Sequence, residues 1–303
     1  EKSSLTTEAW NLTSQTEAKL MQKLKSAGIP LGEYVDGKIF YGIKTGLNEA
    51  FIITKEQRDE LIQQDPKSAE IIKPFLQGKE IKQYQTPAPT SYLIFLPKGF
   101  TAKEGNNPRN PSKWMSETYP AVFEHLLRYE TKAKARYDKG EYWWELRACD
   151  YYDAFEKPKI IYPNILKRPE FTFDSEGLYT NQKCFIISLD DKFLLGILNS
   201  SVAYYLYDRM FPKLRGGFFE PSFVFMKHLP IPTPVKHQRI ANEIESIVNT
   251  VLLESNISVS LLQRDEALLK NHVDYLLNKL NQLIYQLYNL TEEEIQIIED
   301  AIR

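Results

Sequence analysis

A proline-rich segment near residue 230 divides this chain of 303 residues into two parts with different hydrophobic patterns. The segment reads Leu229-Pro230-Ile231-Pro232-Thr233-Pro234, and its alternating prolines favour a stiff, extended backbone. Before it, short apolar runs alternate with Gly-, Pro- and Asn-containing turns, which is typical of mixed helices and strands. After it, the apolar residues have helical spacing. The sequence therefore predicts an α+β core followed by a C-terminal helical hairpin or bundle.

Helices are predicted after the proline segment over about 238–253 and 259–288, and beyond the capping box that begins at Thr291. From the second of them onward, leucines recur every seven residues, at Leu262, Leu269, Leu276, Leu283 and Leu290. A stripe of this kind is typical of an antiparallel helix pair or of a face that packs on a core. Dimerisation through the stripe is the alternative.

Before the proline segment, helices and strands are predicted to alternate. Helices are expected over about 15–27, over 54–63 after the capping box Thr54-x-x-Gln57, from 65 to 75–78, over 119–137 and over 193–210. Strands are expected near 38–41, 50–53, 91–96, 159–162 and 184–187.

Composition excludes several classes of protein. With 43% hydrophobic and 26% charged residues, the chain is able to bury a core in one large or two modest domains. Its two cysteines and four histidines lack metal-ligand spacing, so we expect neither a zinc site nor a disulfide framework. No apolar run approaches the roughly 18 residues that cross a bilayer, so we expect a cytoplasmic chain without a membrane partner.

The segment from Tyr41 to Ile53 places Lys44, Thr45 and Asn48 between two apolar runs. Gly42 and Gly46 permit a positive φ or the close approach of another backbone. An ordinary hairpin would explain the pattern. The donors of the loop also suit phosphates or base edges, which makes it a candidate binding site.

Cations, amides and aromatic residues recur in other predicted loops. These are Trp143-Trp144 to Arg147, Asn164 to Arg168 and Lys213 to Gly217. Arg reads guanine, Asn reads adenine, and Lys holds phosphates, so the set fits a cleft that grips a duplex. The tryptophans favour the core over a contact. Because the net charge is −2, any such contact must come from a local basic stripe.

Enzymatic chemistry has weaker support. The loop around Gly42 lacks the spacing of a phosphate-binding P-loop, and no nucleophile elbow is present. Asp65 followed by Glu80-Ile81-Lys82 has the residue order of a metal-dependent nuclease, an order that is common by chance. We therefore expect no catalytic and no metal-binding residue, and keep the nuclease fragment as an alternative.

Several segments, in order, resemble one known family. They are Gly42 to Phe51, Ile71 to Ile81, Lys157 to Pro163, Leu195-Gly196-Ile197-Leu198-Asn199-Ser200-Ser201 and Leu229 to Pro232. This order is similar to that of TaqI-like target-recognition domains, the C-terminal specificity part of adenine-N6 DNA methyltransferases and type IIG restriction-modification enzymes. The resemblance covers about residues 30 to 235 and implies a mixed-sheet domain.

The resemblance implies sequence-specific recognition of double-stranded DNA by a module that is not catalytic by itself. Residues 1–29 would connect it to a missing methyltransferase domain, 30–235 would recognise the target, and 236–303 would form a helical domain. S-adenosylmethionine and an Asn-Pro-Pro-Tyr motif would belong to that other domain, since neither a matching loop nor the motif occurs here. The first residue, Glu1, also suggests an excised part.

Eight residues are the predicted DNA contacts. Lys44, Lys213 and Arg215 would mainly hold phosphates, while Thr45, Asn48, Asn164 and Arg168 would face base edges, with Lys167 beside them. A protein-interaction module built on the C-terminal leucines is the remaining alternative.

Overall fold

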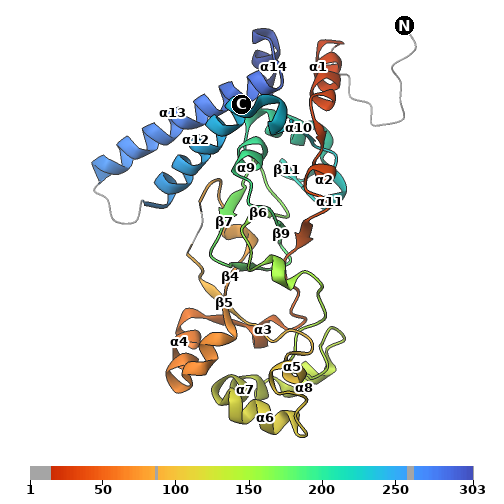
Figure 1. Cartoon of the computed structure of the whole chain (residues 1–303), viewed down its shortest axis with the longest axis vertical. Helices are drawn as coiled ribbons and strands as arrows, with labels where there is room; N and C mark the ends of the chain where they lie inside the picture. Colours follow the sequence, from red (N-terminus) through yellow and green to blue (C-terminus); the bar gives the residue numbers. More distant parts are fainter. Residues whose placement is uncertain (1–14, 86–87, 258–262, 303) are drawn as a thin grey trace, which may run out of the picture.

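Two four-stranded sheets lie one after the other along the length of the molecule (Figure 1). The computed structural model describes residues 15–85, 88–257 and 263–302. The first sheet has the order β2-β9-β6-β7 and is antiparallel throughout. Its strands are β2 (Ile39–Tyr41), β9 (Cys184–Ile187), β6 (Lys159–Pro163) and β7 (Thr172–Asp174).

The second sheet has the order β3-β5-β4-β8 and is mixed, because β4 and β8 run parallel. Its strands are β3 (Ile52–Thr54), β5 (Ser91–Ile94), β4 (Ile72–Leu76) and β8 (Tyr179–Thr180). Helices α4 (Lys55–Gln64), α5 (Phe100–Glu104), α6 (Pro111–Thr118), α7 (Pro120–Leu127) and α8 (Glu130–Ala135) gather at this end of the molecule. The mixed sheet that the family resemblance implies is confirmed.

The first sheet separates two hydrophobic cores. Side chains alternate between the two faces of a strand, so neighbours in β6 enter different cores: Ile160 and Tyr162 pack in one, Ile161 in the other. In β9, Phe185 and Ile187 share the core of Ile160. Burial on both faces explains why these strands read as continuous apolar runs.

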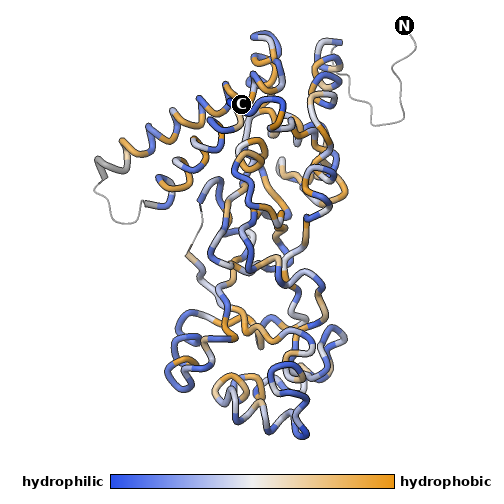
Figure 2. Tube along the Cα trace, viewed as in Figure 1, coloured by the Kyte–Doolittle hydropathy of each residue, from blue (hydrophilic) through white to orange (hydrophobic). Residues whose placement is uncertain are grey.

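The core of Ile160 also contains the helices around it. These are α1 (Gln15–Ser26), α9 (Lys192–Leu198), α10 (Ser201–Met210), α12 (Gln238–Ile257), α13 (Gln263–Leu287) and α14 (Glu292–Ile302). Helix α12 packs on α9 and α13, and α10 packs on α13 and α14. Orange and blue segments alternate along α12 and α13 in Figure 2, as expected of amphipathic helices that cover a core.

The leucine stripe faces this core, as a helix pair predicts. Leu283 is buried, and Leu276 and Leu290 pack against the same cluster. Leu262 lies outside the described residues. Residues on both sides of position 235 contribute to this core. The division of the chain into domains at 29/30 and 235/236 stays a prediction.

Strand β1 (Ile29–Pro30) pairs with β12 (Pro230–Ile231), so the two ends of the 30–235 region meet. A Cβ on Gly28 would lie 2.1 Å from the carbonyl oxygen of Ile231, which explains the glycine. No helix in the described ranges is both long enough and apolar enough to cross a membrane.

Three predicted helices were wrong in part. The one expected to run to 75–78 ends with the 3-10 turn η1 (Pro66–Glu70), and the chain continues as β4, because pairing with β5 overrides local propensity. The helix over 119–137 is divided into α7 and α8. The helix over 193–210 is divided at Asn199 into α9 and α10, and the Ser200 hydroxyl caps the second.

Candidate nucleic-acid interface

Two predicted binding segments, those of Gly42 and Asn164, lie on either side of the turn between β8 and β9, residues 181–183. Each forms a backbone hydrogen bond at or next to this turn. The backbone N–H of Gly42 donates to the carbonyl of Cys184 at 2.9 Å, and that of Asn164 donates to the carbonyl of Lys183 at 2.8 Å. A Cβ on Gly42 would lie 1.9 Å from the carbonyl oxygen of Asn181, so only glycine fits this close approach. Two clefts flank the turn.

The first, which we call the aromatic cleft, has a volume of about 450 Å³. Its lining includes Tyr41, Lys44, Arg147, Cys149, Tyr151, Tyr152 and Gln182. The Nζ atom of Lys44 lies 3.1 Å from a carboxylate oxygen of Asp138, and a guanidinium nitrogen of Arg147 lies 3.7 Å from the same oxygen. Asp138 therefore offsets part of the positive charge of this cleft.

The second, the basic cleft, has a volume of about 690 Å³. Its charged lining residues are Lys79, Lys82, Lys167, Arg168, Lys183 and Glu170. Five cations thus face one carboxylate, which lies 3.9 Å from Lys82. A local positive surplus exists even though the net charge of the chain is −2. Asn164 lies in the same lining.

A short hairpin borders the basic cleft. It consists of β10 (Lys213–Leu214) and β11 (Phe218–Phe219), joined by Arg215, Gly216 and Gly217. Leu166 and Phe219 exchange backbone hydrogen bonds of 3.2 and 2.8 Å, so the 164–168 segment forms a third member of this ribbon. Positive φ values of 84° and 75° at Gly216 and Gly217 form the turn. Two separate sequence segments, residues 164–168 and 213–219, therefore meet here.

The two predicted cations of the hairpin differ in their surroundings. Lys213 lies 2.8 Å from a carboxylate oxygen of Asp208. Arg215 is exposed at the tip, and within the described part of the chain it forms no ion pair. Arg215 is thus the more available of the two for a ligand.

The loop from Gly42 to Phe51 is not a hairpin, because β2 and β3 belong to different sheets. Thr45 is 1% exposed, and its hydroxyl donates to the Oδ1 atom of Asn48 at 2.6 Å. Thr45 is thus buried in this conformation, and its contact with a base edge stays a prediction. Thr45 orients Asn48, which is exposed.

A buried cation holds this loop. Arg136 is 6% exposed and donates to the carbonyl oxygens of Thr45 and Trp143, both at 2.7 Å, and of Glu145 at 3.0 Å. Its guanidinium carbon also lies 4.5 Å from the ring centre of Phe51. Burial lowers the pKa of Arg136 to about 10, so it remains charged at neutral pH.

Glu145 is a buried anion that holds neighbouring loops in place through hydrogen bonds. It is fully buried, and its carboxylate accepts from the backbone N–H groups of Gly99, Thr101 and Glu141 at 3.0, 2.9 and 2.9 Å. Trp144 is buried beside it, as predicted for a core residue. The buried, hydrogen-bonded charges of Arg136 and Glu145 thus position the loops of the aromatic cleft rather than contact a ligand.

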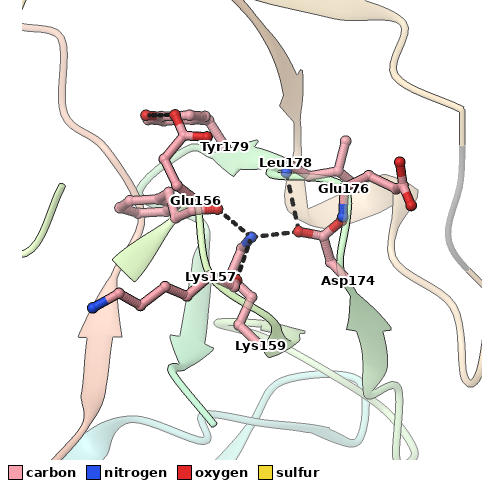
Figure 3. A network of polar contacts seen from close by, with 8 residues as sticks. Glu156, Lys157, Lys159, Asp174, Glu176, Leu178 and Tyr179 are labelled. Atoms are coloured by element: carbon pink, nitrogen blue, oxygen red, sulfur yellow. Dashed lines mark hydrogen bonds and ion pairs between the residues drawn. The ribbon is translucent and has the colours of Figure 1, made fainter. Parts of the chain in front are cut away.

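A buried ion pair supports β6 and β7, the strands on either side of residues 164–171. Lys159 and Asp174 are opposite each other in the ladder, both side chains are fully buried, and they form an ion pair (Figure 3). Lys159 also donates to the carbonyl of Phe155 at 2.5 Å. The Asp174 carboxylate accepts from the N–H groups of Glu176 and Leu178, both at 3.0 Å. Burial lowers the pKa of Lys159, against the opposing effect of Asp174.

Asn199 fixes the end of the same 164–171 segment. Its Oδ1 atom accepts from the N–H of Phe171 at 3.0 Å, and its Nδ2 atom donates to the carbonyl of Phe171 at 2.9 Å. The side chain is 7% exposed. Asn199 therefore links the junction of α9 and α10 to the loop that carries Lys167 and Arg168.

The predicted contacts fall into two groups. Asn164, Lys167 and Arg168 line the basic cleft, with the Lys213 and Arg215 hairpin beside it, while Lys44 lines the aromatic cleft. Sequence reasoning missed the further members of the basic cleft, which are Lys79, Lys82, Lys183 and Phe218. No local signal marked these residues, because the structure rather than the sequence brings them to the cleft.

The residues of the nuclease alternative are engaged locally. Asp65 accepts from the N–H of Lys67 and from the hydroxyl of Ser68, which caps η1. Glu80 accepts from the N–H of Gln77 at 2.6 Å and from the hydroxyl of Thr90. Across residues 15–85, 88–257 and 263–302, no group of three or more His, Cys, Asp or Glu side chains could hold a metal ion.

Comparison with known proteins identifies the family of the chain. A family model described as the TaqI-like C-terminal specificity domain matches residues 73–231, which is more than half of the chain. The chain belongs to this family. The TaqI-like match includes the basic cleft, the hairpin and Asn199, and it confirms the resemblance found in the sequence.

Among solved structures, the Type IIL restriction-modification enzyme MmeI in complex with DNA shares the fold. The TM-score is 0.59 with 13% sequence identity, over 88% of this chain and 35% of that enzyme. The type IIG restriction endonuclease BpuSI matches with a TM-score of 0.49 and 13% identity, over 90% of this chain and 33% of the other. The chain thus spans about a third of the length of each. No curated protein matches the sequence.

Proposed function

We propose that this TaqI-like specificity domain binds double-stranded DNA at a specific sequence and does so through the basic cleft and the β10–β11 hairpin. The observation that carries the proposal is the meeting of five cations with a hairpin tip that bears the exposed Arg215. Cations that neutralise phosphates release condensed counterions, and this release favours binding. The neighbouring Asn164 and Arg168 supply the groups that read base edges.

The two clefts contribute differently in this proposal. Among the described residues of the basic cleft, only Lys82 has a nearby carboxylate partner, at 3.9 Å. In the aromatic cleft, Asp138 already neutralises part of the charge of Lys44 and Arg147. Phosphate contacts therefore concentrate in the basic cleft, and Lys44, which lines the aromatic cleft, and Asn48 contribute less. Lys213 must break its ion pair with Asp208 to bind a phosphate, which reduces its net contribution to the binding free energy.

The partner of the module is a methyltransferase domain of the same parent polypeptide. MmeI is named as a restriction-modification enzyme and was solved with DNA, and this chain matches 35% of it. We propose that residues 1–29 lead from such a domain, that 30–235 recognise the target and that 236–303 brace the fold. S-adenosylmethionine would bind in the catalytic domain.

The salt dependence of duplex binding tests the proposal. A slope of roughly −0.9 in log K against log salt per phosphate contact predicts about −4.5 if all five cations engage. Replacing both Lys79 and Lys183 with alanine is expected to reduce the slope by about 2. The control is Lys113→Ala, a lysine of α6 outside both clefts whose side chain is 67% exposed.

Two outcomes would contradict the proposal. One is the absence of binding to duplex DNA at low salt. The other is a double variant whose slope equals that of the Lys113→Ala control, since DNA would then bind elsewhere on the chain.

A further inference from the structure

The ribbon beside the basic cleft exposes apolar side chains among its cations. Leu166 and Phe219 form its inner face, with 1% and 4% exposure. Side chains alternate along a strand, so their neighbours lie on the outer face. Ile165 is 44% exposed there and Phe218 is 36% exposed, and both line the basic cleft.

Local contacts hold the ring of Phe218 against the ribbon. The Nζ atom of Lys167 lies 4.9 Å from the centre of the ring. A Cβ on Gly216 would lie 3.5 Å from two ring atoms, so the turn backbone passes close to the ring. A ring that intercalates needs both faces free for stacking on base pairs. Phe218 lacks that freedom and instead presents an exposed apolar surface.

The surrounding charge identifies the kind of partner. Five cations against one carboxylate favour a polyanion, and an antiparallel ribbon is one of the two elements that the major groove of B-DNA admits. The apolar group that DNA displays in this groove is the C5-methyl group of thymine. An apolar surface framed by cations therefore matches a thymine-bearing major groove.

We propose that Phe218 and Ile165 contact thymine C5-methyl groups when the β10–β11 ribbon enters the major groove, and that they contribute to specificity. The inference rests on the proposed function, since it assigns an apolar readout to the same DNA-binding surface. Lys167 and Arg168 hold the adjoining backbone and base edges, while the two apolar side chains distinguish thymine from uracil at the same position.

The test compares duplexes of identical sequence that differ only in the methyl group. A mixed-sequence DNA is amplified with either dTTP or dUTP, and the full chain is titrated with each product in competition. Loss of one buried methyl contact is expected to weaken binding by about fourfold. Phe218→Ala is expected to remove most of the preference, whereas Val224→Ala, an exposed apolar residue outside both clefts, is expected to retain it.

The outcomes separate this inference from the proposed function. Equal, salt-dependent binding of the two DNAs overturns the methyl readout and leaves DNA recognition intact. A thymine preference that persists in both Phe218→Ala and Ile165→Ala also overturns it, because another surface must then read the methyl group. No binding of either DNA at low salt overturns the proposed function and this inference with it.

Discussion

Replacing Asp174 with asparagine should destabilise the domain strongly, because it removes the charge that compensates the buried Lys159 ammonium. Both side chains are fully buried, and the lysine would keep only carbonyl acceptors, among them that of Phe155 at 2.5 Å. Breaking a buried ion pair by removing one partner costs about 3–5 kcal/mol. The single side-chain oxygen of the introduced asparagine would still accept from one of the two backbone N–H groups, so the lower half of that range is expected.

A double-mutant cycle isolates the pair. Lys159→Met combined with Asp174→Asn removes the uncompensated charge, so the double variant should be more stable than Asp174→Asn alone by about 2 kcal/mol. The measurement is urea unfolding followed by circular dichroism, with midpoints compared at equal slope. Strictly additive effects of the two substitutions would refute the reasoning, as would a loss below about 1 kcal/mol for Asp174→Asn.

Three further predictions concern single residues. Asn199→Ala leaves the buried backbone groups of Phe171 unpaired, so unfolding free energy should fall by about 2–4 kcal/mol, measured by urea titration, with weaker DNA binding in gel-shift assays. Gly42→Ala drives a Cβ into the backbone of Asn181, so the melting temperature should drop. His125 is buried, and desolvation lowers its pKa, so the unfolded state binds a proton more readily than the folded state. The free energy of unfolding should therefore fall as pH drops below about 6.5, the ordinary pKa of histidine. The variant His125→Phe should abolish this pH dependence.

Local signals in the sequence predicted much of the fold. The capping box at Thr54 and Gln57 starts α4 as predicted, because its hydrogen bonds involve neighbours in the chain. Strand β4 was missed because its stability comes from pairing with β5 and β8, which are distant in sequence. The break at Asn199 was missed for a related reason, since its side chain bonds to Phe171.

The candidate site was only partly predictable. Asn164, Lys167 and Arg168 form one short cationic segment, so their pattern is visible along the chain. Lys79 and Lys183 join them only through the fold, because a close backbone approach brings Gly78 beside Lys183. The burial of Thr45 could not be predicted from a polar loop, because it depends on the fold, in which the distant Arg136 donates to the Thr45 carbonyl.

Hydrogen exchange with and without duplex DNA tests the central claim most directly. Amides in the segments that line or border the basic cleft, residues 78–82, 164–168, 183 and 213–218, should exchange more slowly when DNA is bound, and the effect should weaken as salt rises. The exposed end of the α12–α13 pair, near Leu253 and Leu268, should be unchanged. Protection confined to those helices, with none at the cleft, would contradict the assignment of the basic cleft as the DNA-binding surface.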